Sequence, residues 1–294
     1  MSRFVLLGHP VSHSLSPAIH SAAYRALGLP HRYEVLDVPD EAALAHAVAR
    51  LRSGEIAGAN VTVPHKARAL ELADSADPLA RETEAANVLS PEAGRLVAYN
   101  TDVSALVAEL ARLTPGATSA IVIGAGGAAR AAVSACRARG MGRITVLARR
   151  FDGRADPAEA PGGAALLRMG ASICPWPSDA YGASRVADAV SAVDVLIQAT
   201  SAGMAGVEGD AIARVVPWEH VPASAMAYDV VYTPAVTPFL VAARARGLEA
   251  HGGLGMLVGQ AASAVALWLG VEPPLVAMRA AAEEALAARE RGEG

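Results

Sequence analysis

Residues 122–130 read VIGAGGAAR, an apolar run followed by a glycine turn and the small residues of a helix start. Gly124, Gly126 and Ala129 match the pattern G-x-G-x-x-A. The first glycine of this pattern makes a tight turn, the second lets the backbone approach a pyrophosphate, and the third small residue lets helix and strand pack closely. Free N–H groups at the helix start favour an anion. The stretch predicts a dinucleotide-binding strand–turn–helix unit, with a purely structural turn as the alternative.

The next strand pattern, RITVLARR at 143–150, ends where such a unit usually carries its ribose-reading residue. An acidic side chain there would accept a hydrogen bond from the ribose 2′-hydroxyl of NAD, but this chain has Arg149 and Arg150. Guanidinium groups accommodate a 2′-phosphate instead. The pattern therefore predicts NADP, with a solvated basic pair at a strand end as the alternative.

Strand and helix patterns alternate through the rest of the chain. Ser16 as N-cap and Pro17 at the first helical position open one helix, and Gly28 ends it. The run NVTVPHK at 60–66 predicts a strand that stops at Pro64, because proline cannot donate to a β-ladder. Alternation of this kind predicts an α/β fold with largely parallel sheets.

Composition narrows the class of protein. The 294 residues are 53% hydrophobic and 18% charged, which suits two folded domains and does not suit a disordered chain. A net charge of −4 gives no reason to expect nucleic acid or an anionic membrane as partner. The uncharged stretch at 253–271 is marginal in length for a membrane span, so a buried helix is favoured. Cys136 and Cys174 lie far apart and lack a metal-ligand spacing, so we expect neither a metal nor a disulfide framework. We also expect a cytoplasmic protein.

Further motifs occur in one order along nearly the whole chain, and together they resemble the shikimate dehydrogenase family. They are GHPVSHSLSPAIH at 8–20, GANVTVPHK at 58–66, AANVL at 85–89, NTD at 100–102, GAGGAAR at 124–130, ARR at 148–150, ATSAGM at 199–204, YDVVY at 228–232, TPF at 237–239 and GLGMLVGQAA at 253–262. So many separate motifs in one order make a chance match improbable.

The resemblance implies a substrate-binding catalytic domain at 1–103, completed by C-terminal helices at 253–294, and a doubly wound Rossmann NADP-binding domain at 104–252. It implies the reversible, NADPH-dependent reduction of 3-dehydroshikimate to shikimate, a step of aromatic amino acid (chorismate) biosynthesis. Quinate and aminoshikimate dehydrogenases share this scaffold and are alternatives, as is a non-catalytic dinucleotide-binding sensor. We expect a small-molecule substrate, a monomer or homodimer, and neither nucleic acid nor membrane as partner.

Two residues are assigned to the chemistry by the resemblance. Lys66 matches the family's proton-transfer lysine and Asp102 its partner. A carbonyl that gains hydride develops alkoxide character, so an ammonium group beside it stabilises the transition state and can donate the proton. Without the resemblance, Lys66 would be interpreted as a solvated loop lysine. A sensor needs neither residue, which argues against that alternative.

The resemblance assigns another set of residues to the substrate. Ser14 and Ser16 precede a helix, where hydroxyl and N–H groups can hold the substrate carboxylate, although Ser16 could serve only as a cap. Tyr232 matches a family tyrosine near that carboxylate, or is a core aromatic. The positions matching family residues that bind ring hydroxyls are Thr62, Asn87, Asp102 and Gln260. Asn87 could instead be a turn residue, and Gln260 a satisfied polar group inside a helix.

The cofactor residues implied by the resemblance are Gly124, Ala125, Gly126, Gly127, Ala128, Ala129, Arg149, Arg150, Thr200, Val230 and Gly253. Gly253 could instead serve only as a turn into a helix. The chain departs from the family at three places. Val103, Ser104 and Ala105 follow NTD where small glycine-containing residues are usual. Ala148 stands at the asparagine of the usual phosphate clamp, and Val230 replaces a methionine often found over the nicotinamide.

Overall fold

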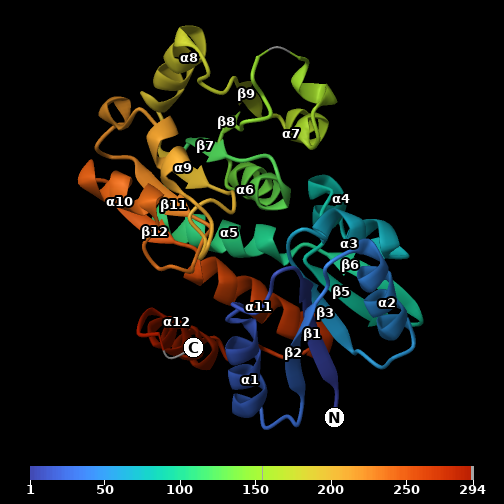
Figure 1. The fold of residues 1–294 in the computed structure, drawn as a ribbon. Helices are drawn as coiled ribbons and strands as arrows, with labels where there is room; N and C mark the ends of the chain where they lie inside the picture. Colours follow the sequence, from blue (N-terminus) through green and yellow to red (C-terminus); the bar gives the residue numbers. More distant parts are fainter. Residues whose placement is uncertain (154, 293–294) are drawn as a thin grey trace. The chain divides into compact units, whose positions relative to one another are not determined.

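The computed structural model describes residues 1–153 and 155–292. Two compact units divide the chain, Met1–Ala105 with Gly255–Gly294 and Leu106–Leu254. Each unit contains one six-stranded sheet with helices packed against it, which confirms the predicted α/β fold (Figure 1). Two helices, α5 (Thr101–Leu113) and α11 (Leu254–Leu269), begin in one unit and end in the other.

The second unit has a wholly parallel sheet in the order β12-β11-β10-β7-β8-β9. This order, with the first strand at the centre and the chain winding outward on both sides, is that of a doubly wound dinucleotide-binding fold. Its strands are β7 (Ser119–Ile123), β8 (Arg143–Leu147), β9 (Ser172–Cys174), β10 (Val195–Gln198), β11 (Met226–Asp229) and β12 (Glu249–Gly252). Its helices are α6 (Gly127–Ala138), α7 (Gly163–Arg168), α8 (Ala180–Val190), α9 (Asp210–Val215) and α10 (Pro238–Ala245), with 3₁₀ turns at Pro157–Glu159 and Trp218–His220.

The central strands of this sheet are buried along their whole length. Every residue of β7, β10 and β11 is buried, because helices cover both faces of a parallel sheet. Ile121, Ile123 and Leu196 from these strands share one apolar core with Phe239 and Leu240 of α10. The turns that follow these strands are therefore attached to a well-packed core.

The first unit has a mixed sheet in the order β2-β1-β3-β5-β6-β4, in which β5 runs antiparallel to both of its neighbours. Its strands are β1 (Arg3–Gly8), β2 (Arg32–Asp37), β3 (Gly58–Val61), β4 (Ser75–Ala76), β5 (Val88–Glu92) and β6 (Arg95–Tyr99). Its remaining helices are α1 (Ser16–Ala26), α2 (Glu41–Arg52), α3 (Lys66–Leu72), α4 (Pro78–Thr83) and α12 (Leu275–Glu290). Ala93 and Gly94 connect β5 and β6 with positive φ angles of 48° and 78°, as a tight hairpin turn requires.

Two local expectations are wrong. Helix α1 begins at Ser16 itself, so Ser16 is not the N-cap, and its N–H donates to the Ser14 hydroxyl at 3.1 Å. Strand β3 ends at Val61, because the chain turns at once: the N–H of His65 donates to the carbonyl of Thr62 at 3.0 Å. Lys66 consequently opens helix α3 and is not a loop residue.

The C-terminal helices complete the first unit. Helix α12 packs along α1, at the opposite end of the sequence (Figure 1). Helix α11 approaches the start of α5 so closely that a Cβ at Gly259 would lie 3.3 Å from Cβ of Ala105. Glycine at position 259 leaves room for Ala105, the third residue after the NTD motif. No helix of the described residues combines the length and the apolar character that crossing a membrane requires.

Candidate functional site

A short ion pair joins two residues that lie 36 positions apart in the first unit. Nζ of Lys66, at the start of α3, donates to Oδ2 of Asp102, in the first turn of α5, at 2.5 Å. The exposed fractions of the two side chains are 17% and 6%. An ammonium and a carboxylate that are largely removed from water form a strong, charge-assisted hydrogen bond.

Lys66 is also the only lysine of the chain: the other 24 of its 25 Lys and Arg residues are arginines. A guanidinium stays protonated at every working pH, whereas a primary amine can give up a proton and take it back. The one primary amine among the side chains of this protein thus meets the buried carboxylate of Asp102. This count was available from the sequence alone, and it favours proton transfer at this position.

Asn87 fixes the second oxygen of Asp102. Its Oδ1 accepts from the N–H of Thr101 at 2.7 Å, so its NH₂ group must point the other way. That NH₂ group donates to Oδ1 of Asp102 at 2.8 Å and to the Thr101 hydroxyl at 2.9 Å. Both carboxylate oxygens of Asp102 are therefore held, and the contact of Asn87 with the substrate stays a prediction.

Gln260 enters the same buried cluster from α11. Its Nε2 donates to the carbonyl of Leu257 at 2.9 Å, which turns Oε1 towards the NH₂ groups of Asn87, at 3.4 Å, and Asn60, at 3.5 Å. These two contacts are long, so Oε1 keeps capacity to accept from another donor. The sequence-based prediction missed Asn60, which is 4% exposed in β3. The available signal was an amide inside an otherwise apolar strand, since buried polar groups need partners.

Ser14 lies on the loop that leads into α1, and Ser16 is the first residue of that helix. Ser16 is buried, Ser14 is half-buried, and the Ser14 hydroxyl accepts from the N–H of Ser16. Arg289 of α12 donates to the carbonyl oxygens of His13 and Ser14, the latter at 3.1 Å, and so anchors this loop. Within the described residues no hydrogen bond joins the serines to Lys66, so their place beside the substrate stays a prediction.

Thr62 lies at the point where the ends of β1 and β3 meet. A Cβ on Gly8 would lie 2.3 Å from Cγ2 of Thr62, so only glycine permits this approach. The N–H of Thr62 donates to the carbonyl of Leu7 at 2.8 Å, which fixes the backbone four residues before Lys66. The side chain is partly exposed, as a residue that binds a ligand requires.

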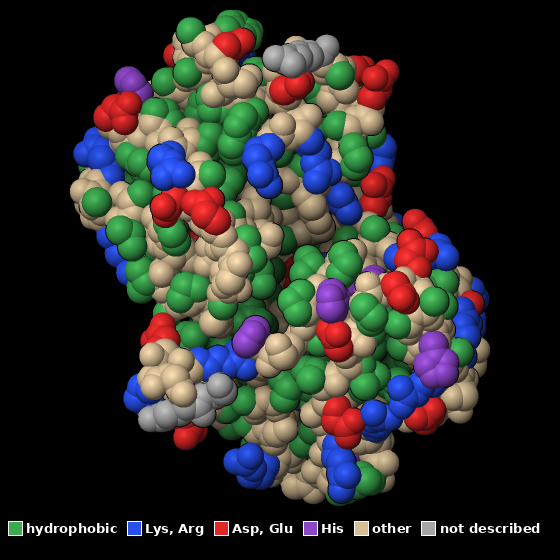
Figure 2. All heavy atoms as spheres, in the orientation of Figure 1, with side chains coloured by type: hydrophobic (Ala, Val, Ile, Leu, Met, Phe, Trp, Pro, Cys, Tyr) green, Lys and Arg blue, Asp and Glu red, His purple; other side chains and the backbone are tan. Residues whose placement is uncertain are grey.

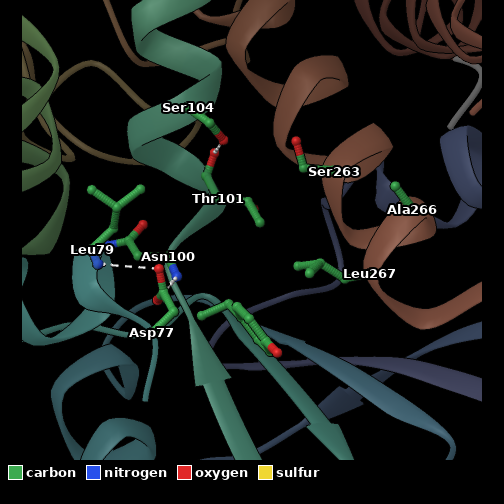
Figure 3. A pocket seen from close by; sticks show the side chains of 9 residues that line it. Asp77, Leu79, Asn100, Thr101, Ser104, Ser263, Ala266 and Leu267 are labelled. Carbon is green, nitrogen blue, oxygen red and sulfur yellow. Dashed lines mark hydrogen bonds between the residues drawn. The ribbon is translucent and has the colours of Figure 1, made fainter. Parts of the chain in front are cut away.

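A cavity of about 410 Å³ lies at the first turn of α5 (Figure 3). It is lined by Asp77, Leu79, Tyr99, Asn100, Thr101, Ser104, Ser263, Ala266 and Leu267, none of them a predicted site residue. The Asp77 carboxylate already caps α4 by accepting from the N–H groups of Leu79 and Ala80. We therefore assign no ligand to this cavity. Within the described residues there is also no group of three or more His, Cys, Asp or Glu suited to a metal ion.

The glycine turn of the second unit has the geometry its sequence predicts. Gly124 follows β7 with φ of 126°, and a Cβ there would lie 2.9 Å from the carbonyl oxygen of Ala199. Gly126 is the N-cap of α6, is exposed, and has open space where a Cβ would be. Ala129 is fully buried. The turn thus leaves room for a phosphate group at a helix N-terminus, although binding itself stays a prediction.

Arg149 and Arg150 follow β8 and are both exposed. Arg150 donates to the carbonyl of Pro161 at 2.5 Å, whereas Arg149 forms no hydrogen bond or ion pair within residues 1–153 and 155–292. Figure 2 shows basic side chains gathered over the part of the second unit that contains α6 and α7. Ala148, at the clamp position, is 6% exposed and faces the interior. Arg149 is thus the arginine available to a phosphate.

Three further predicted cofactor residues lie at the carboxyl ends of neighbouring parallel strands. Thr200, Val230 and Gly253 follow β10, β11 and β12. A Cβ on Gly253 would lie 2.1 Å from the carbonyl oxygen of Val230, so no larger residue fits there. This edge is where doubly wound sheets bind ligands. Tyr232 also belongs to the second unit, and its predicted contact with the substrate stays a prediction.

Asp229, the last residue of β11, holds the turns beside Thr200 and Val230. Its carboxylate is fully buried and accepts from the hydroxyl of Thr237 at 2.6 Å, from the N–H of Val231 at 2.9 Å and from the amide of Gln198 at 3.2 Å. Burial raises the pKa of Asp229 to about 7, although the hydrogen bonds from Thr237 and Val231 act in the opposite direction.

The stability of Asp229→Asn, measured against that of the wild-type protein at the same pH, is expected to be more favourable at pH 8 than at pH 5. In the folded chain Asp229 ionises with a pKa of about 7, and in the unfolded chain near its ordinary value of 3.8. Stability from this group therefore falls as pH rises between these values, by about 1.4 kcal/mol per pH unit at most, and asparagine does not titrate. Unfolding free energies of both proteins at several pH values test this. A difference that stays constant from pH 5 to pH 8 would contradict it.

Comparison with known proteins gives a consistent result. Residues 6–89 match the family model described as shikimate dehydrogenase substrate binding domain, and residues 253–283 that of the shikimate 5′-dehydrogenase C-terminal domain. The chain is 38% identical over 288 residues to shikimate dehydrogenase (NADP(+)) of Geobacter sulfurreducens, covering 96% of each chain.

Two solved structures have the same fold. One is shikimate 5-dehydrogenase from Thermus thermophilus in complex with NADP(H) and shikimate, with a TM-score of 0.80, 34% identity, and coverage of 97% of this chain and 100% of that one. The other is quinate dehydrogenase from Corynebacterium glutamicum in complex with NAD, with a TM-score of 0.80, 27% identity, and coverage of 96% and 99%. The protein belongs to the shikimate dehydrogenase family.

Proposed function

We propose that the protein catalyses the reversible, NADPH-dependent reduction of 3-dehydroshikimate to shikimate, an oxidoreductase step of aromatic amino acid biosynthesis. The observation that carries this is the ion pair of the partly buried Lys66 with the buried Asp102, which Asn87 also holds. Family membership supplies the substrate class, and the sole lysine of the chain supplies a group able to transfer a proton.

Lys66 and Asp102 have different roles in the proposed reaction. NADPH, when bound, supplies the hydride. Nζ of Lys66 donates a proton to the carbonyl oxygen as negative charge develops there, and takes it back from the alcohol in the reverse reaction. Asp102 holds the amine in place through its Oδ2 and is itself held by Asn87 through its Oδ1. The proton donor is thus positioned before the substrate arrives.

The amide groups of the site favour a hydroxyl-bearing substrate over an amino analogue. Oε1 of Gln260 is an acceptor, and the NH₂ groups of Asn87 and Asn60 beside it are donors. A hydroxyl group can donate to the first and accept from the second, whereas an ammonium group can only donate. Ser14, Ser16 and Tyr232 hold the carboxylate in this proposal, and Thr62 another ring hydroxyl.

NADP is the cofactor. The residues proposed to hold it are the turn Gly124 to Ala129, Arg149 and Arg150 at the 2′-phosphate, and Thr200, Val230 and Gly253 at the strand ends. We further propose a cytoplasmic enzyme that acts as a monomer or homodimer and binds neither nucleic acid nor membrane.

Purified protein is expected to reduce NADP with shikimate, and to do so with NAD at a kcat/KM lower by about tenfold or more. A charge-assisted contact to the 2′-phosphate contributes about 1.5–3 kcal/mol, which sets this ratio. Rates with shikimate, quinate and aminoshikimate, each with both cofactors, are followed by the absorbance of the reduced nicotinamide. A higher kcat/KM with quinate or aminoshikimate than with shikimate would overturn the proposed substrate.

Arginine variants test the cofactor part separately. Arg149→Ala should lose activity with NADP and keep its activity with NAD, and Arg150→Ala should lose less, because Arg150 already donates to Pro161. Arg143→Ala, at an exposed arginine at the start of the same strand, is the matched control and should change neither. Equal losses with both cofactors would show that the arginines do not bind the 2′-phosphate.

A further inference from the structure

Tyr33 joins the amide groups of the site from a neighbouring strand. Its hydroxyl donates to Oδ1 of Asn60 at 2.7 Å, and the two residues are 6% and 4% exposed. In the sheet, Tyr33 lies opposite Phe4 of β1 and Asn60 lies opposite Leu6. The tyrosine therefore reaches diagonally across β1, over the sheet face that Phe4 and Leu6 share, to meet the asparagine.

This hydrogen bond decides which way round the Asn60 amide lies. With Oδ1 bonded to the phenol, Nδ2 points to the other side, where it lies 3.5 Å from Oε1 of Gln260 and 3.4 Å from the carbonyl oxygen of Asn87. A reversed amide would place its oxygen against two other acceptor oxygens. Since the contacts of Nδ2 are long, the short bond from Tyr33 is the strongest constraint on the orientation.

His20 of α1 holds the tyrosine ring in place. The two rings are parallel within 3°, with centroids 4.0 Å apart. His20 is fully buried, and burial lowers its pKa to about 3 against a smaller opposite effect of the Asn60 side chain, so the imidazole is neutral. A neutral ring stacked at this distance restricts the plane of the phenol and hence the place of its hydroxyl.

We propose that Tyr33 is a positioning residue for substrate binding: through Asn60 it fixes the direction of the hydrogen bonds around Gln260 and so the place for one substrate hydroxyl. Tyr33 itself touches no reacting atom. The inference rests on the proposed function, because a ring hydroxyl of the substrate is what accepts from Nδ2 of Asn60 and donates to Oε1 of Gln260.

Tyr33→Phe removes only the O–H group and tests the proposal. Without its donor, the Asn60 amide is held only by its two long contacts, and the KM for shikimate should rise about three- to tenfold, as for one lost neutral hydrogen bond. The kcat and the KM for NADP should change by less than about twofold. Tyr24→Phe is the matched control. Tyr24 is a buried tyrosine of the adjoining aromatic cluster, and its hydroxyl has no hydrogen-bond partner within the described residues.

A double-mutant cycle separates positioning from general stability. In an Asn60→Ala background, Tyr33→Phe should leave the KM for shikimate unchanged, because Tyr33 acts only through Asn60. Thermal unfolding checks each variant, and Asn60→Ser takes the place of Asn60→Ala if the latter does not fold. The proposal is overturned if Tyr33→Phe behaves like Tyr24→Phe, or if its effect is the same with and without Asn60. A wild-type protein inactive on shikimate would instead overturn the proposed function.

Discussion

Lys66→Arg is expected to lower kcat by about 10²–10⁴-fold, the usual contribution of one proton-transferring group. Arginine keeps the positive charge, so Asp102 retains a partner and the fold is preserved, but a guanidinium does not release its proton in the working pH range. The KM for shikimate should change far less than kcat, because the lost interaction belongs to the transition state. Steady-state kinetics in both directions measure this.

Two companion variants sharpen the test. Lys66→Ala should be at least as slow, since it removes both the proton donor and the charge. Arg68→Ala lies two residues further along α3, where the arginine forms an exposed ion pair with Glu71, and should leave kcat unchanged because such pairs contribute little. A folded Lys66→Arg protein with the wild-type kcat would show that the amine supplies only charge.

Asp102→Asn is expected to have the second large effect, a fall in kcat of at least about 10²-fold. Asn87 already donates to Oδ1, so the new NH₂ group would stand at the position of Oδ2 and point its hydrogens at the Lys66 ammonium. Two donors then face each other, and the amine leaves the place where it meets the carbonyl oxygen. Kinetics of the single variants and of Lys66→Arg combined with Asp102→Asn measure the effect.

The double variant is informative because the two residues act as one unit. We expect it to be little slower than either single variant, since groups that act together give non-additive losses. Asp77→Asn is the matched control: this carboxylate caps α4 and also accepts from the N–H of Asn100, two residues before Asp102. It should leave kcat intact and lower stability by less than the roughly 0.5–2 kcal/mol that loss of an N-cap costs, because asparagine also caps helices. Fully multiplicative losses in the double variant would mean that the residues act independently.

The parts of this molecule that sequence predicts well depend on local geometry. The turn at Gly124 is one example, because a positive φ after a buried strand is a demand on a single residue. The two errors, at Ser16 and at the end of β3, come from boundaries, where one competing hydrogen bond moves a helix start or a strand end by one or two residues.

The parts that sequence misses depend on contacts between distant segments. Tyr33 and Asn60 meet only because both strands pair with β1 in a particular register, which no local pattern encodes. Arg289 anchors the loop of Ser14 only because α12 packs along α1 at the other end of the chain. The pairing of Lys66 with Asp102 was expected from family resemblance, and neither residue's own neighbours in sequence would have suggested it.

The single lysine makes amine labelling of this protein a measurement at its proposed catalytic residue. A reagent that acylates primary amines has two targets, Lys66 and the amino terminus of the chain, so intact-mass analysis counts the open sites directly. The same property is a hazard in the laboratory. Coupling through amines, a common way to attach proteins to a sensor surface or a dye, can join this enzyme to its support through the group proposed to do the chemistry.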